Sequence, residues 1–174
     1  MARWLIITFI AVCATIGGCD REKKEPAVGT DTYVKFTSHL GNSFLAPSQW
    51  TTTDEGDTFS LKSPDGQANI YAFMFTAEGS GSIQEFRETC ASGFLPKDEP
   101  GWKPSRWTDF KLGERDAQKM DLIPAPGSHQ HRRLYVLDNG KFYYAIVLYG
   151  SDTAMTLNGG FYENIVRTFN GVRE

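Results

Sequence analysis

The sequence lacks three features that would place it in a familiar class: abundant cysteine, excess positive charge and a long apolar run. Three cysteines in 174 residues are too few for a disulfide-rich secreted scaffold. A formal net charge of −3 without a basic stripe argues against nucleic acid as a partner. The N-terminal apolar stretch, residues 5–16, is shorter than the roughly 20 residues that a membrane-spanning helix needs.

That N-terminal stretch is typical of an export signal. Arg3 supplies the positive start, residues 5–16 the apolar segment, and small residues follow. The sequence Ile16-Gly17-Gly18-Cys19 resembles the lipobox of bacterial lipoproteins, in which the chain is cut before an invariant cysteine that becomes diacylated. The resemblance implies cleavage after Gly18 and lipidation of Cys19. The alternative is an ordinary secretion signal in which Cys19 has no role.

A lipidated Cys19 would place the protein in the cell envelope, anchored to a membrane and facing the periplasm or the exterior. Asp20 resembles the signal that retains enteric lipoproteins at the inner membrane. Residues 19–32 are charged, then small and polar, and predict a flexible tether. Residues 33–174 are then expected to form a single globular domain. Cys90 is the one cysteine left inside it, so no intramolecular disulfide is expected there.

The first half of that domain predicts a hairpin followed by a helix. A short strand at 44–47 precedes two strands at 58–62 and 69–75, which the turn sequence Ser-Pro-Asp-Gly joins. Ser82 and Glu85 match a helix capping box. Apolar residues follow at helical spacing and share one face: Ile83, Phe86, Cys90 and Phe94.

The second half predicts four strands and a closing helix. The strands are expected at 107–112, 116–123, 133–137 and 142–149, and the helix at 160–169. Asn139-Gly140 predicts a hairpin with a type I′ turn between the last two strands. Residues 142–148 are nearly all apolar, which indicates a central strand covered on both faces. The expected fold is α+β, an α/β/α sandwich with a central, mainly antiparallel sheet.

Several short motifs resemble the Mog1/PsbP-like superfamily, which includes DcrB-type bacterial lipoproteins. Together they span most of residues 40–170, and the loop at 96–107 departs from the family pattern. The motifs are Phe44-x-x-Pro47-x-x-Trp50, Phe59-x-Leu61-x-Ser63-Pro64-Asp65-Gly66-x-Ala68, Phe142-Tyr143-Tyr144, and Tyr162-Glu163-x-Ile165-Val166-x-x-Phe169. The resemblance implies an opening hairpin, an amphipathic helix, a twisted antiparallel sheet and a closing helix.

Two residue sets are candidates for binding. His129 and His131 would share one side of an extended segment and could contribute to a metal site, which needs further ligands from elsewhere. Because some PsbP-type proteins bind metals, the resemblance to that family also favours a metal site. Trp50, Trp102 and Trp107 lie in or beside loops and are candidate anchors for a protein partner. For both sets the alternative is a purely structural role.

No catalytic pattern accompanies these candidates. The sequence has no Gly-x-Ser-x-Gly elbow, and the segment Gly79-x-Gly81 lacks the third glycine and the lysine of a phosphate-binding loop. Cys90 falls on the apolar helix face, which favours an inert core residue. We therefore expect no cofactor and a non-enzymatic, membrane-tethered module that binds or helps assemble a protein partner. The alternative is a ligand- or metal-binding periplasmic lipoprotein.

Overall fold

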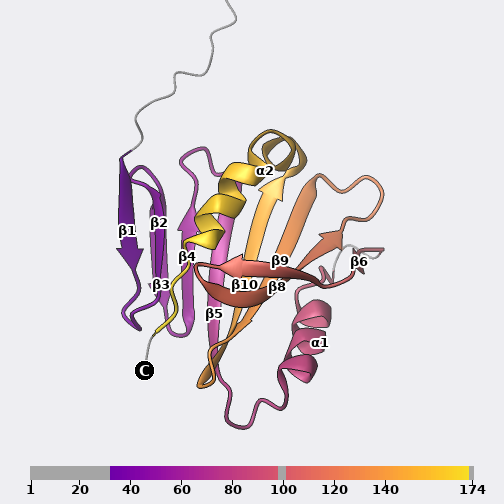
Figure 1. Cartoon of the computed structure of the whole chain (residues 1–174). Helices are drawn as coiled ribbons and strands as arrows, with labels where there is room; N and C mark the ends of the chain where they lie inside the picture. Colours follow the sequence, from indigo (N-terminus) through magenta and orange to yellow (C-terminus); the bar gives the residue numbers. More distant parts are fainter. Residues whose placement is uncertain (1–31, 98–100, 173–174) are drawn as a thin grey trace, which may run out of the picture. The chain divides into compact units, whose positions relative to one another are not determined.

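The computed structural model describes residues 32–97 and 101–172 (Figure 1). The expected cleavage site at Gly18, the lipidation site at Cys19, Asp20 and nearly all of the expected tether lie outside the described residues.

An eight-stranded sheet organises this domain, and all of its strand pairs are antiparallel. The strand order is β3-β4-β5-β10-β9-β8-β6, and β7 also pairs with β8. The strands are β3 (Thr51–Glu55), β4 (Thr58–Lys62), β5 (Ala68–Thr76), β6 (Lys103–Pro104), β7 (Thr108–Leu112), β8 (Arg115–Ile123), β9 (Gln130–Asp138) and β10 (Phe142–Ser151). The sheet therefore places β5, β10 and β9 at its centre.

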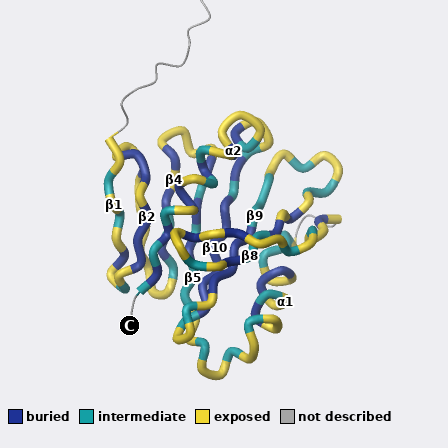
Figure 2. The backbone as a smooth tube through the Cα atoms, viewed as in Figure 1, coloured by how far each residue is buried: buried dark blue, intermediate teal, exposed yellow. Residues whose placement is uncertain are grey.

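Two helices cover opposite faces of this sheet. They are α1 (Ile83–Gly93) and α2 (Asp152–Arg167). Alternate residues of β10 enter different cores, because successive side chains of a strand point to opposite faces. Tyr144, Ile146 and Leu148 pack with residues of α2, whereas Tyr143, Ala145 and Val147 pack with residues of α1. The predicted α/β/α sandwich and the central strand covered on both faces are confirmed, and Figure 2 shows β10 and β9 buried at mid-sheet.

Helix α1 forms as the sequence predicts. The Ser82 hydroxyl accepts from the backbone N–H of Glu85, and the Glu85 carboxylate accepts from the backbone N–H of Ser82. Phe86 and Cys90 are buried on the face that the spacing indicates. The helix ends at Gly93.

Helix α2 begins earlier than predicted. It starts at Asp152 and not at Gly160, with Ser151 as N-cap accepting from the backbone N–H of Ala154. The first two turns hold Thr and Asn residues and give no continuous apolar stripe, so periodicity alone missed them. Ala154 and Gly159 are nevertheless buried, which shows that this part also faces the core.

The hairpin turns follow the predicted positions, but one has a different geometry. Ser63 to Gly66 joins β4 and β5, and Gly66 has φ +68°. Asn139-Gly140 lies between β9 and β10 as expected, but only Gly140 has positive φ. The type I′ turn is therefore wrong, because it requires positive φ at two positions. Lys141 lengthens the loop, and the Asn139 side chain instead accepts from the backbone N–H of Phe142 at 2.7 Å.

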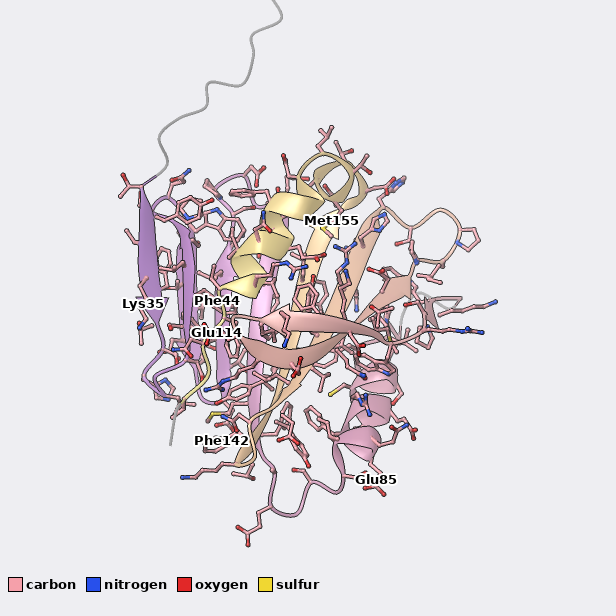
Figure 3. All side chains as sticks on the ribbon, viewed as in Figure 1. Lys35, Phe44, Glu85, Glu114, Phe142 and Met155 are labelled. Carbon is pink, nitrogen blue, oxygen red and sulfur yellow. The ribbon has the colours of Figure 1, made fainter. Side chains whose placement is uncertain are left out.

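Three strands were not predicted: β1 (Tyr33–Thr37), β3 and β6. Strand β1 pairs with β2 (Ser43–Pro47) in a separate two-stranded sheet. Phe44 of β2 packs against Phe169 beyond α2 at 5.0 Å between ring centroids, and Figure 3 labels Phe44 where β2 and α2 meet. The small sheet is thus attached to the α2 side of the main core.

Candidate binding pocket on the central sheet

Helix α1 is too short to cover the whole face of the sheet on its side. Its 11 residues rise about 16 Å at 1.5 Å each, whereas the 10 residues of β10 extend about 33 Å. Even aligned with the strands, α1 could cover only about half the length of β10 on that face.

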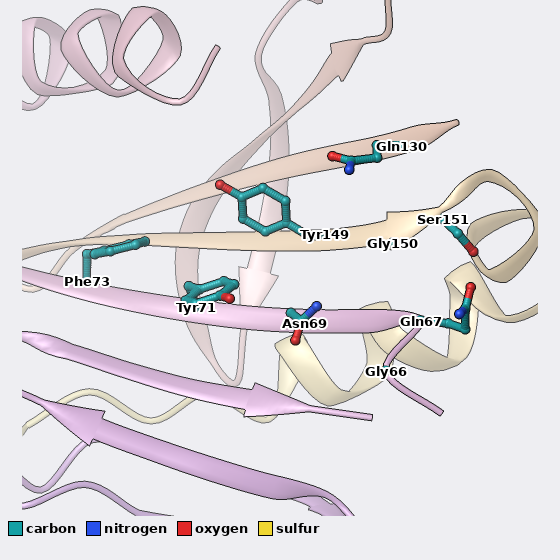
Figure 4. Close-up of a pocket in the computed structure, with 9 residues that line it drawn as sticks. All are labelled: Gly66, Gln67, Asn69, Tyr71, Phe73, Gln130, Tyr149, Gly150 and Ser151. Carbon is teal, nitrogen blue, oxygen red and sulfur yellow. The ribbon is translucent and has the colours of Figure 1, made fainter. Parts of the chain in front are cut away.

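A pocket of about 550 Å³ lies on this face, between the ends of β5, β10 and β9; we call it the β5–β10 pocket (Figure 4). Three aromatic side chains line it: Tyr71, Phe73 and Tyr149. Three carboxamides, Gln67, Asn69 and Gln130, join them, with Ser151 and two glycines completing the lining. None of these residues carries a carboxylate, amino, guanidinium, imidazole or thiol group, so the lining is uncharged.

The rings in the pocket contact one another. Tyr71 stacks beside Phe73 with ring centroids 6.3 Å apart, and it meets Tyr149 edge-on at 5.4 Å. Phe73 in turn contacts Phe94, which follows α1, at 5.2 Å. Asn69, Tyr71 and Phe73 alternate along β5, so their side chains share the pocket face.

Arg132 pairs with Tyr149 across β9 and β10, and its side chain contacts the Tyr149 ring on the same face of the sheet. Its guanidinium lies 4.8 Å from the ring centroid of Tyr149 and 5.2 Å from that of Trp102, and its Nη1 donates to the carbonyl of Phe94 at 3.0 Å. Such cation–π contacts strengthen when the cation is partly desolvated. Burial raises the pKa of Tyr149 above its ordinary value, so its hydroxyl stays protonated at neutral pH.

The carboxamides of the pocket are available for a ligand. Among the described residues, the side-chain amides of Gln67, Asn69 and Gln130 make no hydrogen bond to another side chain or backbone group. Each amide offers two N–H donors and a carbonyl acceptor. The pocket therefore combines fixed aromatic faces with unpaired, neutral polar groups.

The predicted tryptophan anchors lie elsewhere. Trp50 and Trp102 are only 4% and 6% exposed, and Trp107 is half-buried beside the α1 side of the core. Trp50 contacts Tyr162 of α2, and Trp102 packs with Met120 and Leu122 of β8. The side chains of Trp50 and Trp102 are thus used for internal packing, whereas Trp107 keeps part of its surface exposed.

The two histidines lie at the start of β9. His131 lies on the strand, and its Nε2 pairs with Oδ1 of Asp152 at 2.5 Å, whereas His129 precedes the strand and its carbonyl accepts from the backbone N–H of Asp152. Within residues 32–97 and 101–172, no group of three or more His, Cys, Asp and Glu residues is arranged to hold a metal ion.

Cys90 is buried between α1 and the sheet, as its spacing predicts. Burial raises the pKa of its thiol from 9 to about 12. The thiolate, which is the nucleophilic form, is therefore scarce at neutral pH.

Comparisons with known proteins bear on the fold. No protein-family model and no curated protein matches the chain by sequence. Among solved structures, the cyanobacterial PsbP (CyanoP) of Synechocystis superposes with a TM-score of 0.61 at 10% identity, over 84% of this chain and 96% of that one. The domain has a Mog1/PsbP-like fold.

Two further structures agree with this assignment. The Ran-binding protein Mog1p of Saccharomyces cerevisiae superposes with a TM-score of 0.53 at 7% identity, covering 81% of this chain and 96% of that one. LpqN of Mycobacterium tuberculosis, described as involved in cell envelope biogenesis, gives 0.51 at 12% identity, covering 81% and 91%. At such identities the likeness concerns the fold alone.

In the part of the chain that the structure describes, neither α1 nor α2 is long and apolar enough to cross a membrane.

Proposed function

We propose that this chain is a lipid-anchored cell-envelope lipoprotein whose Mog1/PsbP-like domain binds a partner protein without catalysing a reaction. The observation that carries the binding role is the β5–β10 pocket, which offers fixed rings and unpaired amides and has no charged side chain in its lining. The buried, protonated thiol of Cys90 also supports a role without covalent chemistry. The same fold in Mog1p, which is described as Ran-binding, supports a protein as the partner.

The proposed anchor is the modified Cys19, exposed by cleavage after Gly18. Acyl chains contribute about 0.8 kcal/mol per buried CH₂, and stable attachment needs more than one chain. Residues 19–32 would act as a flexible tether that reaches on the order of 20 Å. Asp20 favours retention at the inner membrane in an enteric host. LpqN, described as involved in cell envelope biogenesis, supports an envelope location for a domain of this fold.

The pocket also supports a second candidate, a ligand-binding envelope lipoprotein. A concave site with few, well-placed polar groups is the usual form of a small-molecule or oligomer site. In this version the domain binds a ligand at the β5–β10 pocket. The metal-binding form of this candidate would use His129 and His131, with Asp152 paired to His131.

The anchor is tested by expressing the full chain in a bacterial host with radiolabelled palmitate. The native chain is expected to incorporate label and to sediment with membranes, and Cys19→Ser to lose the label. Cys90→Ala is the matched control and should behave as the native chain, because Cys90 is buried in the domain. Labelling of Cys19→Ser at the native level would contradict the proposal.

The partner is tested by crosslinking intact cells and capturing the tagged protein from membranes. The proposal expects an envelope protein that is enriched with the native chain and reduced with Cys19→Ser at equal expression. That protein should also bind the purified domain-containing chain directly. A failure of direct binding would overturn the protein partner while leaving the anchor intact.

A further inference from the structure

The chemistry of the β5–β10 pocket identifies a class of ligand beyond a protein partner. We propose that this pocket binds an uncharged glycan, with sugar rings against its aromatic side chains and sugar hydroxyls on its carboxamides. The inference rests on the second candidate function above, in which the domain binds a ligand at this pocket.

The uncharged lining is the first argument. Phosphate and carboxylate ligands are recognised by Arg or Lys side chains or by backbone N–H groups at helix starts. The pocket lining has no Lys, Arg or His. The nearby guanidinium of Arg132 lies against two rings and donates from Nη1 to the carbonyl of Phe94, while its buried Nε has no hydrogen-bond partner among the described residues. An anionic ligand would therefore meet no charged side chain in the lining. At the start of α2, where Ser151 lines the pocket, the backbone N–H of Ala154 already donates to the Ser151 hydroxyl and that of Asp152 to the His129 carbonyl.

The carboxamides are the second argument, because they disfavour a purely apolar ligand. An acyl chain lying over Asn69 and Gln130 would remove water from these amides and leave their hydrogen bonds unmade, which is costly. A sugar hydroxyl both donates and accepts, as a carboxamide does, so the two groups satisfy each other. Gln67 provides a third such group at the end of the pocket.

The rings supply the complementary surface. The face of an aromatic ring is electronegative, and it attracts the positively polarised C–H bonds that a sugar ring presents on one side. Tyr71 and Tyr149 are half-buried and held by their mutual contact, and Arg132 holds Tyr149 further. Rings that are already ordered lose little conformational entropy when a ligand binds.

The sheet topology argues against an extended peptide in this place. A peptide that adds to a sheet needs a free strand edge for its backbone hydrogen bonds. The strand β5 is paired on both sides, by β4 and β10, and β10 is paired by β5 and β9. Only the faces of these strands are available at the pocket, so recognition there depends on side chains.

The test measures binding of the purified full chain, kept in a zwitterionic detergent without a sugar headgroup. The probes are neutral hexasaccharides of glucose, mannose, galactose and N-acetylglucosamine, immobilised on biosensors. The comparison ligands are hexagalacturonate, palmitate and an uncharged extended decapeptide. We expect saturable binding to at least one neutral hexasaccharide and weaker or no binding to the three comparison ligands.

Substitutions of pocket residues test whether the glycan binds in the β5–β10 pocket. Gln130→Ala should weaken it about fivefold, the effect of one lost hydrogen bond, and Tyr149→Phe by a similar factor through its hydroxyl. Tyr149→Ala should weaken it by about tenfold or more. Gln84→Ala, an exposed amide on α1 far from the pocket lining, is the matched control and should bind as the native protein.

Gln130 is exposed, so its replacement should leave the fold intact, and circular dichroism of each variant checks this. Absence of binding to every neutral hexasaccharide would overturn the proposal. Stronger binding to hexagalacturonate, palmitate or the peptide would overturn it as well, in favour of that ligand class. Equal loss in Gln84→Ala and Gln130→Ala would show that the glycan binds outside the pocket. The acylation of Cys19 is tested separately by palmitate labelling. A protein partner captured by crosslinking would have to bind outside a pocket that holds a glycan.

Discussion

Glu163 is the residue that ties α2 to the polar part of the sheet. It is 15% exposed, and its carboxylate pairs with Arg133 at 2.7 Å, with Arg167 at 3.1 Å and with Lys119 at 3.4 Å. Asp121 also pairs with Arg133, at 2.6 Å. Three cations thus converge on one partly buried carboxylate, which makes it the central charge of the network.

Removing the charge of Glu163 should therefore destabilise the fold. Glu163→Gln keeps the shape of the side chain but removes its negative charge. Arg133 then has only Asp121 as an ionic partner, and Lys119 and Arg167 lie close to Arg133 with no carboxylate between them. We expect a loss of about 2 kcal/mol in the free energy of unfolding, measured by urea denaturation at neutral pH.

An exposed ion pair provides the matched control for this experiment. Asp116 pairs with Lys111 at 2.5 Å, but its side chain is 92% exposed. Asp116→Asn should change the free energy of unfolding by less than about 0.5 kcal/mol, because water screens such pairs. If both variants lower the free energy of unfolding by the same amount, the Glu163 network has no special role in holding α2.

At the scale of single elements, the start of α1 depends on its capping box. The Ser82 hydroxyl satisfies the N–H of Glu85, which has no partner inside the helix. Ser82→Ala should cost about 1 kcal/mol of stability. Glu85, which completes the box, lies at the end of α1 in Figure 3. Thr89→Ala, on the exposed side of the same helix, is the control and should be neutral or slightly stabilising, because alanine favours helix.

The box also predicts a pH dependence. The backbone N–H and then the hydroxyl of Ser82 hold the pKa of the Glu85 carboxyl below its ordinary value of 4.5. A lowered pKa in the fold contributes stability above pH 4.5, and that contribution is lost as the pH falls through the folded-state pKa. The difference in stability between the native chain and Glu85→Gln should thus be largest at neutral pH and shrink in acid. A stability difference that grows in acid would contradict a lowered pKa of Glu85 in the folded state.

The sequence predicted the helices and strands whose own residues show a capping motif or an apolar pattern. It missed those that form because a neighbouring strand is available for pairing. Helix α1 has a capping box and a single apolar stripe, so its start and buried face were both correct. Strand β3 reads Thr-Thr-Thr-Asp-Glu and is exposed along its whole length, so no alternation marks it. It is a strand because β4 offers an edge to pair with.

At the scale of the whole molecule, the same reasoning explains why the pocket was not predicted. The run of apolar residues in β10 correctly indicates cover on both faces, and Tyr143, Ala145 and Val147 do meet α1. Whether that cover extends to Tyr149 depends on how far α1 reaches along the sheet. No local pattern contains that information. The alternation of Asn69, Tyr71 and Phe73 on one face of β5 was the available signal for a partly polar surface.

The two-sided cover of β10 predicts that both cores unfold together. Ile146 faces the α2 core and Val147 the α1 core, and both side chains are fully buried. Ile146→Ala and Val147→Ala should each cost about 2 to 4 kcal/mol, as cavities in a packed core do. Leu157→Ala, at a position 74% exposed on α2, is the control and should change stability by less than about 0.5 kcal/mol.

Native-state hydrogen exchange distinguishes a shared core from two separate ones. The amides of β10 are paired with both β5 and β9, so they should exchange only through global unfolding. Val147→Ala should then accelerate exchange in β10, β5 and α2 by the same factor as in α1. The reason is that β10, which the substitution destabilises, also contributes side chains to the core on the α2 side. Acceleration confined to α1 would mean that this helix opens alone. The sheet face around the β5–β10 pocket would then belong to a locally unstable layer, and not to the rigid central sheet on which the orientation of its tyrosines depends.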